Sequence, residues 1–308
     1  MSRFLITGAN GQLGKSIQDA VRDAKLYSRF IFVGHKGLDI TDEDAVTKFM
    51  ETNEIEAVVN CAAYTNVAMA ETEEGSREAY ECNCEGVRVL TKACQEKGIY
   101  LIHISTDYVF DGTKNTPYLP SDNRNPLNEY GRTKMYGEDH VLSYGKGIVF
   151  RTSWLFSEYG KNFLTTMADR VNMEKETHVV TDQIGNPTYA GDLARFIVRI
   201  LAEEKYKGKS GAYHFTNSGS CSWYDLASFI EYQLLVPSVK YSVIRPTTSV
   251  NYFTDNVARP SYSVLNTEKL ADFGVECPRS WIWAVEECCY RNLPEPHEKE
   301  RSIIGVGK

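Results

Sequence analysis

Residues 7–14 read TGANGQLG, in which Gly8, Gly11 and Gly14 recur at every third position. The apolar run RFLIT directly before them predicts a buried strand, and a helix is expected to follow, to about Ala24. In that context one glycine permits a tight turn, one lets the backbone approach a pyrophosphate, and one lets the helix pack against the strand. The helix N-terminus adds unpaired N–H groups and a partial positive charge. The stretch therefore predicts a dinucleotide-binding turn at the start of an α/β fold.

The order of strand followed by helix continues through the first half of the chain. Apolar, β-rich runs predict further strands at 29–34, 55–63, 99–106 and 146–153. Helical patterns lie between them, at 42–52, at 75–97 and around Tyr130 and Lys134. Such alternation predicts a parallel sheet with helices on both faces, and wholly apolar strands fit a sheet that is buried on both sides. The expected fold class is α/β, a Rossmann-like doubly wound parallel sheet.

The pattern changes after residue 153. Helical stretches are expected at about 159–173, 189–204, 222–235 and 279–292, joined by short strands at 177–181, 211–216 and 240–244. We interpret this part as a smaller α+β substrate-binding domain, interleaved with a last piece of the first sheet. The expected division assigns 1–153 plus about 189–216 to the NAD(P)-binding domain, 154–188 and 217–293 to the nucleotide-sugar domain, and 294–308 to a flexible tail.

Composition limits the classes of function. The 308 residues carry a formal net charge of −7, which argues against nucleic acid or an anionic membrane as a partner. No apolar run is long enough to span a membrane, and the N-terminal apolar run is too short for a signal peptide. The eight cysteines form no CxxC pair, and the histidines form no zinc-site spacing. We expect a cytoplasmic protein with reduced thiols and no metal, either a monomer or a homodimer.

The second strand indicates which dinucleotide is bound. NAD-preferring sites place Asp or Glu at the end of this strand, to hold the ribose 2′-hydroxyl. Here the strand ends FIFVGHKG, so His35 and Lys36 stand in that place. A basic pair suits a 2′-phosphate, which favours NADPH and leaves NADH possible. Asp39 and Ile40, in the LDITD that follows, are expected beside the adenine.

Polar residues follow the third and fourth strands. The third strand ends NCAAYTNV (60–67), and the fourth ends STDYVFDG (105–112). Ligands of open α/β sheets bind beyond the carboxyl ends of the strands, so both segments lie at the expected crevice. YGRTK places Tyr130 and Lys134 four residues apart on a helix. A hydroxyl from Thr106, the phenol of Tyr130 and the ammonium of Lys134 are therefore expected to converge near a nicotinamide.

These motifs together resemble the extended short-chain dehydrogenases/reductases. More narrowly, the chain resembles the dTDP-4-dehydrorhamnose reductases, from the N-terminus to about residue 293. The segments that carry this resemblance are GANGQLG, LDITD, NCAAYTNV, STDYVFDG, YGRTK, RTSWLF, DQIGNPTY and RPSYSVL. The resemblance implies a nucleotide-sugar domain, a dTDP-sugar substrate, and reduction of a 4-keto-6-deoxy sugar nucleotide.

Such a reduction gives three residues defined roles. Tyr130 would be the general acid, with a nearby Lys134 ammonium lowering the pKa of the phenol. Lys134 would also bind the nicotinamide ribose, and Thr106 would hold the substrate carbonyl oxygen. The catalytic residues expected from the resemblance are thus Thr106, Tyr130 and Lys134.

The resemblance implies two further sets of contacts. Cofactor contacts are expected along the glycine turn, after the second and third strands, and at a helix-borne asparagine, namely Gly8, Asn10, Gly11, Gln12, Leu13, Gly14, His35, Lys36, Asp39, Ile40, Cys61, Ala62, Ala63, Tyr64 and Asn83. The same resemblance places Asn83 behind the catalytic lysine. Contacts with the sugar, the diphosphate or the nucleotide are expected from Val67, Thr106, Asp107, Tyr108, Trp154, Asn186 and Arg259, with Ser261 a further candidate.

Alternatives remain. The family pattern has an acid and a lysine where Ala68 and Met69 stand, which leaves substrate detail in that loop open. A dehydratase is disfavoured because Tyr108 occupies the place of the glutamate that would remove the C5 proton. A nucleotide-sugar epimerase would use the same three residues. A non-catalytic NADP-binding protein, like the regulatory subunit of methionine adenosyltransferase, is the alternative that is not an enzyme.

Overall fold

A computed structural model describes residues 3–173, 175–234, 243–255, 257–275 and 277–292. A six-stranded sheet forms its centre, with every neighbouring pair parallel, as predicted. The spatial order is β2-β1-β3-β4-β5-β10, with bounds β1 Arg3–Thr7, β2 Phe30–Phe32, β3 Ile55–Asn60, β4 Tyr100–Thr106, β5 Gly147–Thr152 and β10 Gly211–His214. The order changes direction between β1 and β3, and such a switch point leaves a crevice beyond the strand ends.

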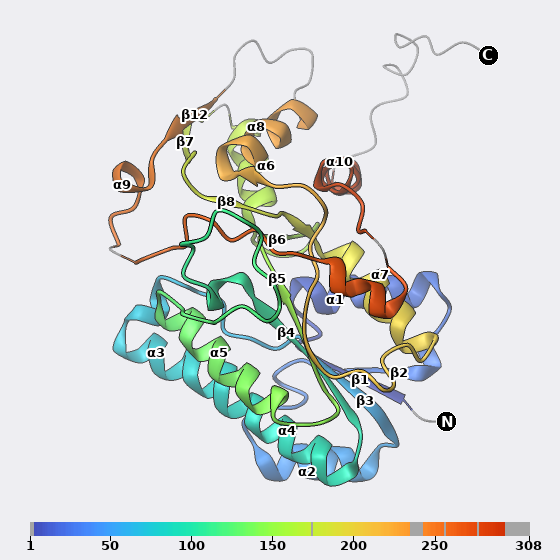
Figure 1. The fold of residues 1–308 in the computed structure, drawn as a ribbon. Helices are drawn as coiled ribbons and strands as arrows, with labels where there is room; N and C mark the ends of the chain where they lie inside the picture. Colours follow the sequence, from blue (N-terminus) through green and yellow to red (C-terminus); the bar gives the residue numbers. More distant parts are fainter. Residues whose placement is uncertain (1–2, 174, 235–242, 256, 276, 293–308) are drawn as a thin grey trace, which may run out of the picture.

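Helices cover both faces of this sheet (Figure 1). Alternate side chains of β1 face opposite ways: Phe4 and Ile6 pack with one set of helices, and Leu5 packs with the other. The first set consists of α1 (Gln12–Asp23) and α7 (Ala190–Ala202). The second set lies on the opposite face and consists of α2 (Glu43–Thr52), α4 (Gly86–Lys97) and α5 (Glu129–Leu142).

The helix expected over 75–97 is not one regular helix. It consists of α3 (Glu73–Tyr80), a π-helical turn over Glu81–Glu85, and α4. The π turn packs directly on α5, since a Cβ added at Gly137 would lie 2.1 Å from the carbonyl oxygen of Asn83. An extra residue of this kind is set by tertiary packing and is frequent at functional sites, so helical periodicity alone does not reveal it.

The second part lies beyond the carboxyl ends of the sheet strands (Figure 1). Three helices, α6 (Phe163–Asn172), α8 (Trp223–Leu234) and α10 (Trp281–Asn292), enclose a second apolar core. Its strands pair in twos, namely β6 (Leu155–Phe156) with β9 (Thr188–Tyr189), β7 (Thr177–Val180) with β12 (Ile244–Thr247), and β8 (Ile184–Gly185) with β11 (Cys221–Ser222). The short helix α9 covers Ser249–Tyr252, and the 3₁₀ turns cover Tyr27–Arg29, Met69–Glu71, Asp107–Val109 and Glu268–Phe273.

Most expected elements appear within a few residues of their predicted bounds. Of the strand expected at 240–244, residues 240–242 lie outside the described residues, and β12 begins at Ile244. The expected tail, 294–308, lies outside them too. The expected strand at 211–216 is β10, which joins the first sheet as its last strand. The division into two domains stays a prediction.

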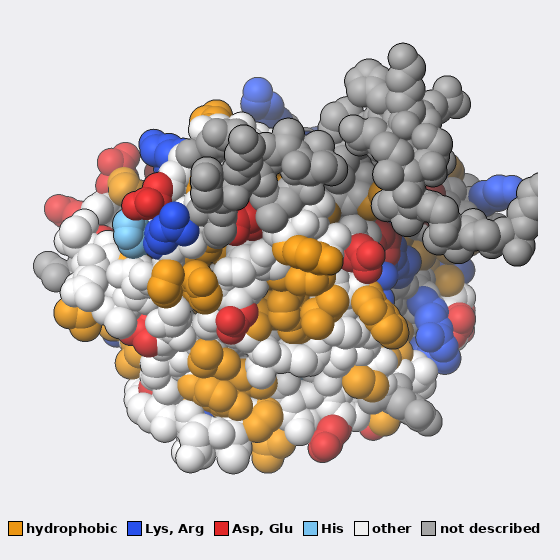
Figure 2. Space-filling model, turned by 90° about the horizontal axis from the view of Figure 1, so that it is seen from above, with side chains coloured by type: hydrophobic (Ala, Val, Ile, Leu, Met, Phe, Trp, Pro, Cys, Tyr) orange, Lys and Arg blue, Asp and Glu red, His pale blue; other side chains and the backbone are white. Residues whose placement is uncertain are grey.

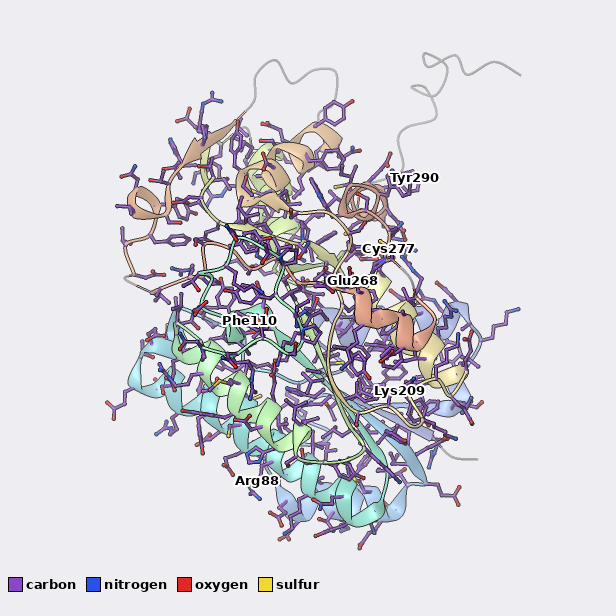
Figure 3. The ribbon with its side chains drawn as sticks, in the orientation of Figure 1. Arg88, Phe110, Lys209, Glu268, Cys277 and Tyr290 are labelled. Atoms are coloured by element: carbon purple, nitrogen blue, oxygen red, sulfur yellow. The ribbon has the colours of Figure 1, made fainter. Side chains whose placement is uncertain are left out.

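A small apolar cluster lies where the loop after β4 meets the second part. Val109, Phe110, Tyr118 and Leu265 form it, and Figure 3 shows Phe110 in the interior while Arg88 projects outward from α4. On the face shown in Figure 2, the described Lys and Arg side chains are scattered among acidic and hydrophobic ones. Within the described part of the chain, no helix is both long and apolar enough to cross a membrane.

Candidate active site

The glycine turn has the close approaches that its sequence predicted. Gly8 has φ +64°, and a Cβ there would lie 2.5 Å from the amide nitrogen of Ala62. A Cβ at Gly14 would lie 2.4 Å from the carbonyl oxygen of Gly8. Gly11 is the N-cap of α1 and has no side chain to cap the first N–H groups, so these remain available to a phosphate. The backbone thus forms a cradle that any larger residue at Gly8 or Gly14 would disrupt.

A cleft of about 660 Å³ opens beside this turn, and we call it the glycine cleft. Ten of the expected cofactor residues line it, namely Gly8, Asn10, Gly11, His35, Asp39, Ile40, Cys61, Ala62, Ala63 and Tyr64. Glu78 and Glu81 line it too, and no motif had indicated them. Lys36 does not line it, whereas His35 does, with 81% of its side chain exposed and its Nδ1 3.9 Å from a carboxylate oxygen of Asp39. The cleft has the size and the backbone donors to hold a dinucleotide.

A second cleft, of about 570 Å³, shares Asn10, Gly11, Cys61 and Ala63 with the glycine cleft. We call it the tyrosine cleft. The three residues expected to converge near the nicotinamide line it, as do two of the expected substrate contacts and two residues of the glycine turn, namely Thr106, Tyr130, Lys134, Asp107, Trp154, Gln12 and Leu13. The three expected catalytic side chains therefore stand in one hollow that is continuous with the dinucleotide cradle.

Local packing fixes the start of the helix that carries Tyr130. Asn128 caps α5 by accepting a hydrogen bond from the Gly131 N–H at 2.9 Å. Gly131 allows the helix to approach the turn after β4, because a Cβ there would lie 2.2 Å from the carbonyl oxygen of Tyr108. The rings of Tyr108 and Tyr130 meet edge to face with their centroids 5.7 Å apart. Tyr130 is consequently held against the end of β4, beside Thr106.

The pKa of Tyr130 departs from the sequence-based expectation. Burial raises it to about 12, and a hydrogen bond with Thr106 offsets only part of that rise. The expectation that Lys134 would lower this pKa below its ordinary value is wrong for the structure. The reason is geometric, since the Lys134 Nζ donates to the carbonyl oxygen of Ile104 at 2.7 Å and lies 3.2 Å from Nε2 of His103.

Lys134 is almost fully buried, with 2% of its surface exposed. Burial lowers its pKa to about 8, because a low-polarity surrounding disfavours the ammonium. The lysine therefore titrates close to physiological pH. Ionisable groups whose pKa is shifted in this way cluster at functional sites.

Asn83 occupies the π turn and is completely buried. Its Oδ1 accepts from the Tyr64 N–H at 2.9 Å, and its Nδ2 donates to the Tyr64 carbonyl at 3.0 Å and to the Thr133 hydroxyl at 3.2 Å. The amide thus joins the loop after β3 to α5. Only the bond to Thr133 reaches a sequence neighbour of Lys134, and Asn83 lines neither the glycine nor the tyrosine cleft.

Asp107 is buried at the inner end of the tyrosine cleft. Burial raises its pKa to about 6, partly offset by hydrogen bonds from Ser263 and Thr106. The Thr106 hydroxyl lies 3.1 Å from Asp107 Oδ1. A carboxylic acid with this pKa can accept a hydrogen bond from a sugar hydroxyl when ionised and donate one when protonated.

Trp154 lines the tyrosine cleft, but a second tryptophan covers its ring. The indoles of Trp154 and Trp223 stack at 3.7 Å with an interplanar angle of 9°. Trp154 has φ +48°, and a Cβ at Gly185 would lie 2.6 Å from its ring. One face of this indole is consequently occupied by protein, which limits the sugar stacking expected from the sequence. Trp223 begins α8 and had no sequence motif to mark it.

A third cleft, of about 210 Å³, is lined by residues of both parts and shares Phe163 and Trp223 with the tyrosine cleft. We call it the arginine cleft. Arg259 and Tyr108 line it, together with the aromatic ring of Phe253. The Arg259 guanidinium lies 3.9 Å from the centroid of that ring and forms a paired contact with Asp255, at 3.0 and 2.6 Å. The cleft thus combines aromatic surface with a guanidinium whose charge is paired with Asp255.

Three expected substrate contacts line none of these clefts. Asn186 is buried and uses both ends of its amide internally, on the Gly219 carbonyl at 2.6 Å and the Leu265 N–H at 2.8 Å. The hydroxyl of Ser261 donates to the Gly112 carbonyl at 3.2 Å. Val67 lies in the loop after β3 and lines none of the three clefts. Lys161, by contrast, lines the tyrosine cleft and was not expected.

The whole chain was compared with known families. The model of the family described as "RmlD substrate binding domain" matches residues 2–293. The chain belongs to this family. The matched span includes the glycine turn, the tyrosine cleft and the arginine cleft.

Relatives of this family member resemble it over almost their full length. A dTDP-4-dehydrorhamnose reductase of Aggregatibacter actinomycetemcomitans is 39% identical over 293 residues, covering 93% of this chain and 98% of the relative. A dTDP-4-keto-6-deoxy-D-glucose reductase of Streptomyces niveus is 36% identical, covering 92% and 96%. The solved dTDP-4-dehydrorhamnose reductase of Bacillus anthracis, in complex with NADP, superposes with a TM-score of 0.85 at 35% identity, covering 94% of this chain and all of that one.

Proposed function

We propose that this family member reduces the 4-keto group of a dTDP-4-keto-6-deoxy sugar, converting dTDP-4-dehydrorhamnose to dTDP-rhamnose with a reduced nicotinamide cofactor. One observation carries the proposal: Thr106, Tyr130 and Lys134 line a single cleft that is continuous with the glycine cradle. The names of the relatives support the substrate. Product sugars of this kind enter cell-surface polysaccharides, and one relative from Bacillus subtilis is named for polysaccharide biosynthesis of the spore coat.

The residues of the cradle fit the cofactor. The close glycines, the uncapped first turn of α1 and the lining of the glycine cleft would hold its diphosphate and adenosine, and Tyr130 and Lys134 would face its nicotinamide end. When bound, the reduced nicotinamide supplies a hydride to the ketone carbon. The protein must then supply a proton to the ketone oxygen.

Tyr130 is suited to supply that proton. A phenol with a pKa of about 12 stays protonated at neutral pH, so it enters the reaction as an acid. The Thr106 hydroxyl, at the end of β4, orients the carbonyl oxygen next to it. Once the proton has left, the hydrogen bond from the Thr106 hydroxyl stabilises the phenolate, and Lys134 in its ammonium form would bind the nicotinamide ribose.

NADPH is the proposed cofactor. The end of β2 presents His35 to the glycine cleft, and no acid stands at the place where NAD-preferring sites hold the ribose. Lys36, the other residue of the basic pair, is adjacent in sequence but does not line the glycine cleft. The relative from Bacillus anthracis that was solved with NADP supports the same choice.

The nucleotide end of the substrate is proposed to occupy the arginine cleft. This cleft adjoins the tyrosine cleft through Phe163 and Trp223, and Arg259 supplies a cation for the diphosphate. Asp107, Tyr108 and Trp154 remain the proposed sugar contacts. Val67 and Asn186, which face other surroundings, are left out.

The test is turnover of a defined substrate. The purified protein is incubated with dTDP-4-keto-6-deoxy-L-mannose and NADPH, the loss of NADPH absorbance is followed, and the sugar product is identified by NMR. A parallel reaction with dTDP-4-keto-6-deoxy-D-glucose tests the activity in the name of the Streptomyces niveus relative. Stoichiometric consumption of NADPH supports the proposal. An epimerase would instead retain its dinucleotide on purification and need none added, and a regulatory subunit would turn over neither sugar.

A cytoplasmic monomer or homodimer is part of this proposal. All eight cysteines are free in the structure, which suits a reducing compartment. Within the described residues there is no group of three or more His, Cys, Asp or Glu side chains that could hold a metal ion. The proposed chemistry uses Thr106, Tyr130, Lys134 and the nicotinamide.

A further inference from the structure

A chain of buried polar side chains runs through the sheet to the catalytic lysine. Thr7, Asn60 and His103 come from β1, β3 and β4, and each is at most 1% exposed. The Thr7 hydroxyl lies 2.6 Å from Asn60 Oδ1, Asn60 Nδ2 lies 3.1 Å from His103 Nδ1, and His103 Nε2 lies 3.2 Å from Lys134 Nζ. None of the first three residues lines the glycine cleft or the tyrosine cleft, and His103 is the one that contacts Lys134 directly.

The hydrogen-bond donors along this chain determine the tautomer of His103. Asn60 Oδ1 accepts from the backbone N–H of Ala62 at 3.2 Å. A backbone N–H can only donate, so the oxygen of the Asn60 amide must face Ala62 and its NH₂ must face His103. That NH₂ donates to Nδ1 of His103, which therefore carries no proton. Burial and the neighbouring Lys134 charge keep the imidazole neutral by lowering its pKa, so its one proton sits on Nε2.

The Nε2–H of His103 consequently points at the amine of Lys134. An ammonium has three N–H donors and no lone pair, so it cannot accept this hydrogen bond. A neutral amine has one lone pair and can accept it, while still donating to the Ile104 carbonyl at 2.7 Å. The arrangement therefore disfavours the ammonium and favours the neutral amine.

We propose that His103 is a positioning residue that, with its tautomer fixed by Asn60, sets the pH at which Lys134 loses its proton and so sets the basic limit of catalysis. The predicted pH profile of turnover rests on the proposed reductase activity, whereas the predicted tautomer of His103 does not. His103 touches neither cleft and acts through the lysine.

Other titratable groups face Lys134 from the elements packed around it. Cys61 follows β3, Cys82 lies on the π turn, and Glu138 is one helical turn further along α5. Burial raises the pKa of both thiols, to about 12 for Cys61, so they stay neutral. Tyr130 and Asp107 share the tyrosine cleft with the lysine, and of these two only Asp107 ionises below pH 8.

Glu138 is already neutralised by arginine. Its carboxylate receives Arg151 Nε at 2.9 Å and Nη2 at 2.7 Å, and Arg124 Nη1 at 3.1 Å. The two arginines therefore balance the negative charge of Glu138, which weakens its electrostatic effect on Lys134. Among the groups that face the Lys134 amine, His103 is the one that hydrogen-bonds it. Asn60 determines which nitrogen of His103 carries the proton of that hydrogen bond.

Two substitutions change the hydrogen-bond donor that His103 presents to Lys134, and both lie at residues that line neither the glycine cleft nor the tyrosine cleft. His103→Gln lets an amide oxygen turn toward Lys134 and accept from its ammonium. Asn60→Asp keeps His103 but replaces the donor that faces Nδ1 with an acceptor, which moves the imidazole proton to Nδ1 and leaves a lone pair on Nε2 toward the lysine. Both variants should move the basic limb of the kcat profile to higher pH by about one unit, the effect of one charge-assisted hydrogen bond. Thr7→Val leaves the Ala62 contact that orients Asn60, so its basic limb should stay in place.

The experiment combines pH–rate profiles of the three variants with NMR of nitrogen-labelled histidine in the free proteins. The His103 signals are assigned by their loss in His103→Gln, and thermal unfolding confirms that each variant is folded. In the unsubstituted protein, a proton on Nε2 and none on Nδ1 supports the proposal, and Asn60→Asp should reverse that pattern. A proton on Nδ1 in the unsubstituted protein overturns it. So does a drop in turnover at every pH with the basic limb unmoved in both variants.

Discussion

Replacing Tyr130 by phenylalanine removes a single hydroxyl from the tyrosine cleft. The ring of Tyr130 is held edge to face by Tyr108, and α5 is fixed by its Asn128 cap, so the backbone should not move. The hydroxyl bonds Thr106, and losing one such hydrogen bond costs about 0.5–1.5 kcal/mol of folding stability. The variant should therefore fold and bind cofactor like the unsubstituted protein.

Turnover should fall much further than stability. General acid catalysis contributes about 10²–10⁴-fold to such reactions, which corresponds to about 3–5 kcal/mol of activation free energy. The fall should appear in kcat and in kcat/KM equally, since the proton is transferred only in the transition state. Initial rates of NADPH loss measure turnover, and isothermal calorimetry measures cofactor affinity.

The matched control is Tyr136→Phe, on the same helix. Tyr136 is 38% exposed and lines none of the three clefts, so the loss of its hydroxyl should leave kcat within a factor of about two. If Tyr130→Phe kept the turnover of this control, Tyr130 would not be the proton donor. The same conclusion would follow if its turnover loss were matched by an equal loss of cofactor affinity.

Three further outcomes can be measured directly. Since burial lowers the pKa of Lys134 to about 8, the ammonium is lost as pH rises through that value, and kcat should fall on the basic side of about pH 8; a flat profile to pH 10 would contradict this. Glu138→Gln leaves the buried Arg151 without its counter-charge and should lower the free energy of unfolding by about 3–5 kcal/mol, measured by urea denaturation. Glu85→Gln, which breaks an exposed ion pair with Arg88, should lower it by at most about 1 kcal/mol. Equal losses of stability in the two variants would refute the reasoning. His35→Ala should raise the KM for NADPH more than that for NADH, and equal changes would mean that this residue does not meet the 2′-phosphate.

The sheet could be predicted because the sequence patterns that specify its strands and its first turn are local. Apolar runs and glycine spacing fix the strands and the first turn, and the carboxyl ends of parallel strands must meet at one rim. This argument placed Thr106, Tyr130 and Lys134 correctly in one cleft. It could not supply the pKa of Tyr130, which depends on how completely later segments bury the phenol.

Contacts between segments that are far apart in the chain could not be predicted from the sequence. Asn186 follows a motif that suggests a ligand, yet its amide bonds Gly219 and Leu265, whose positions only the folded chain determines. The stack of Trp223 on Trp154 joins residues that no periodicity relates. The π turn at Asn83 likewise follows from packing on α5 and not from helical spacing.

The paired tryptophans give the protein an optical reporter at the proposed substrate site. Only four tryptophans exist in the chain, and two of them stack face to face between the tyrosine cleft and the arginine cleft. Their emission depends on the polarity and the contacts of the wall that they form. A nucleotide sugar bound in the proposed site would lie against this wall and should change that emission, so binding can be followed with the unlabelled protein.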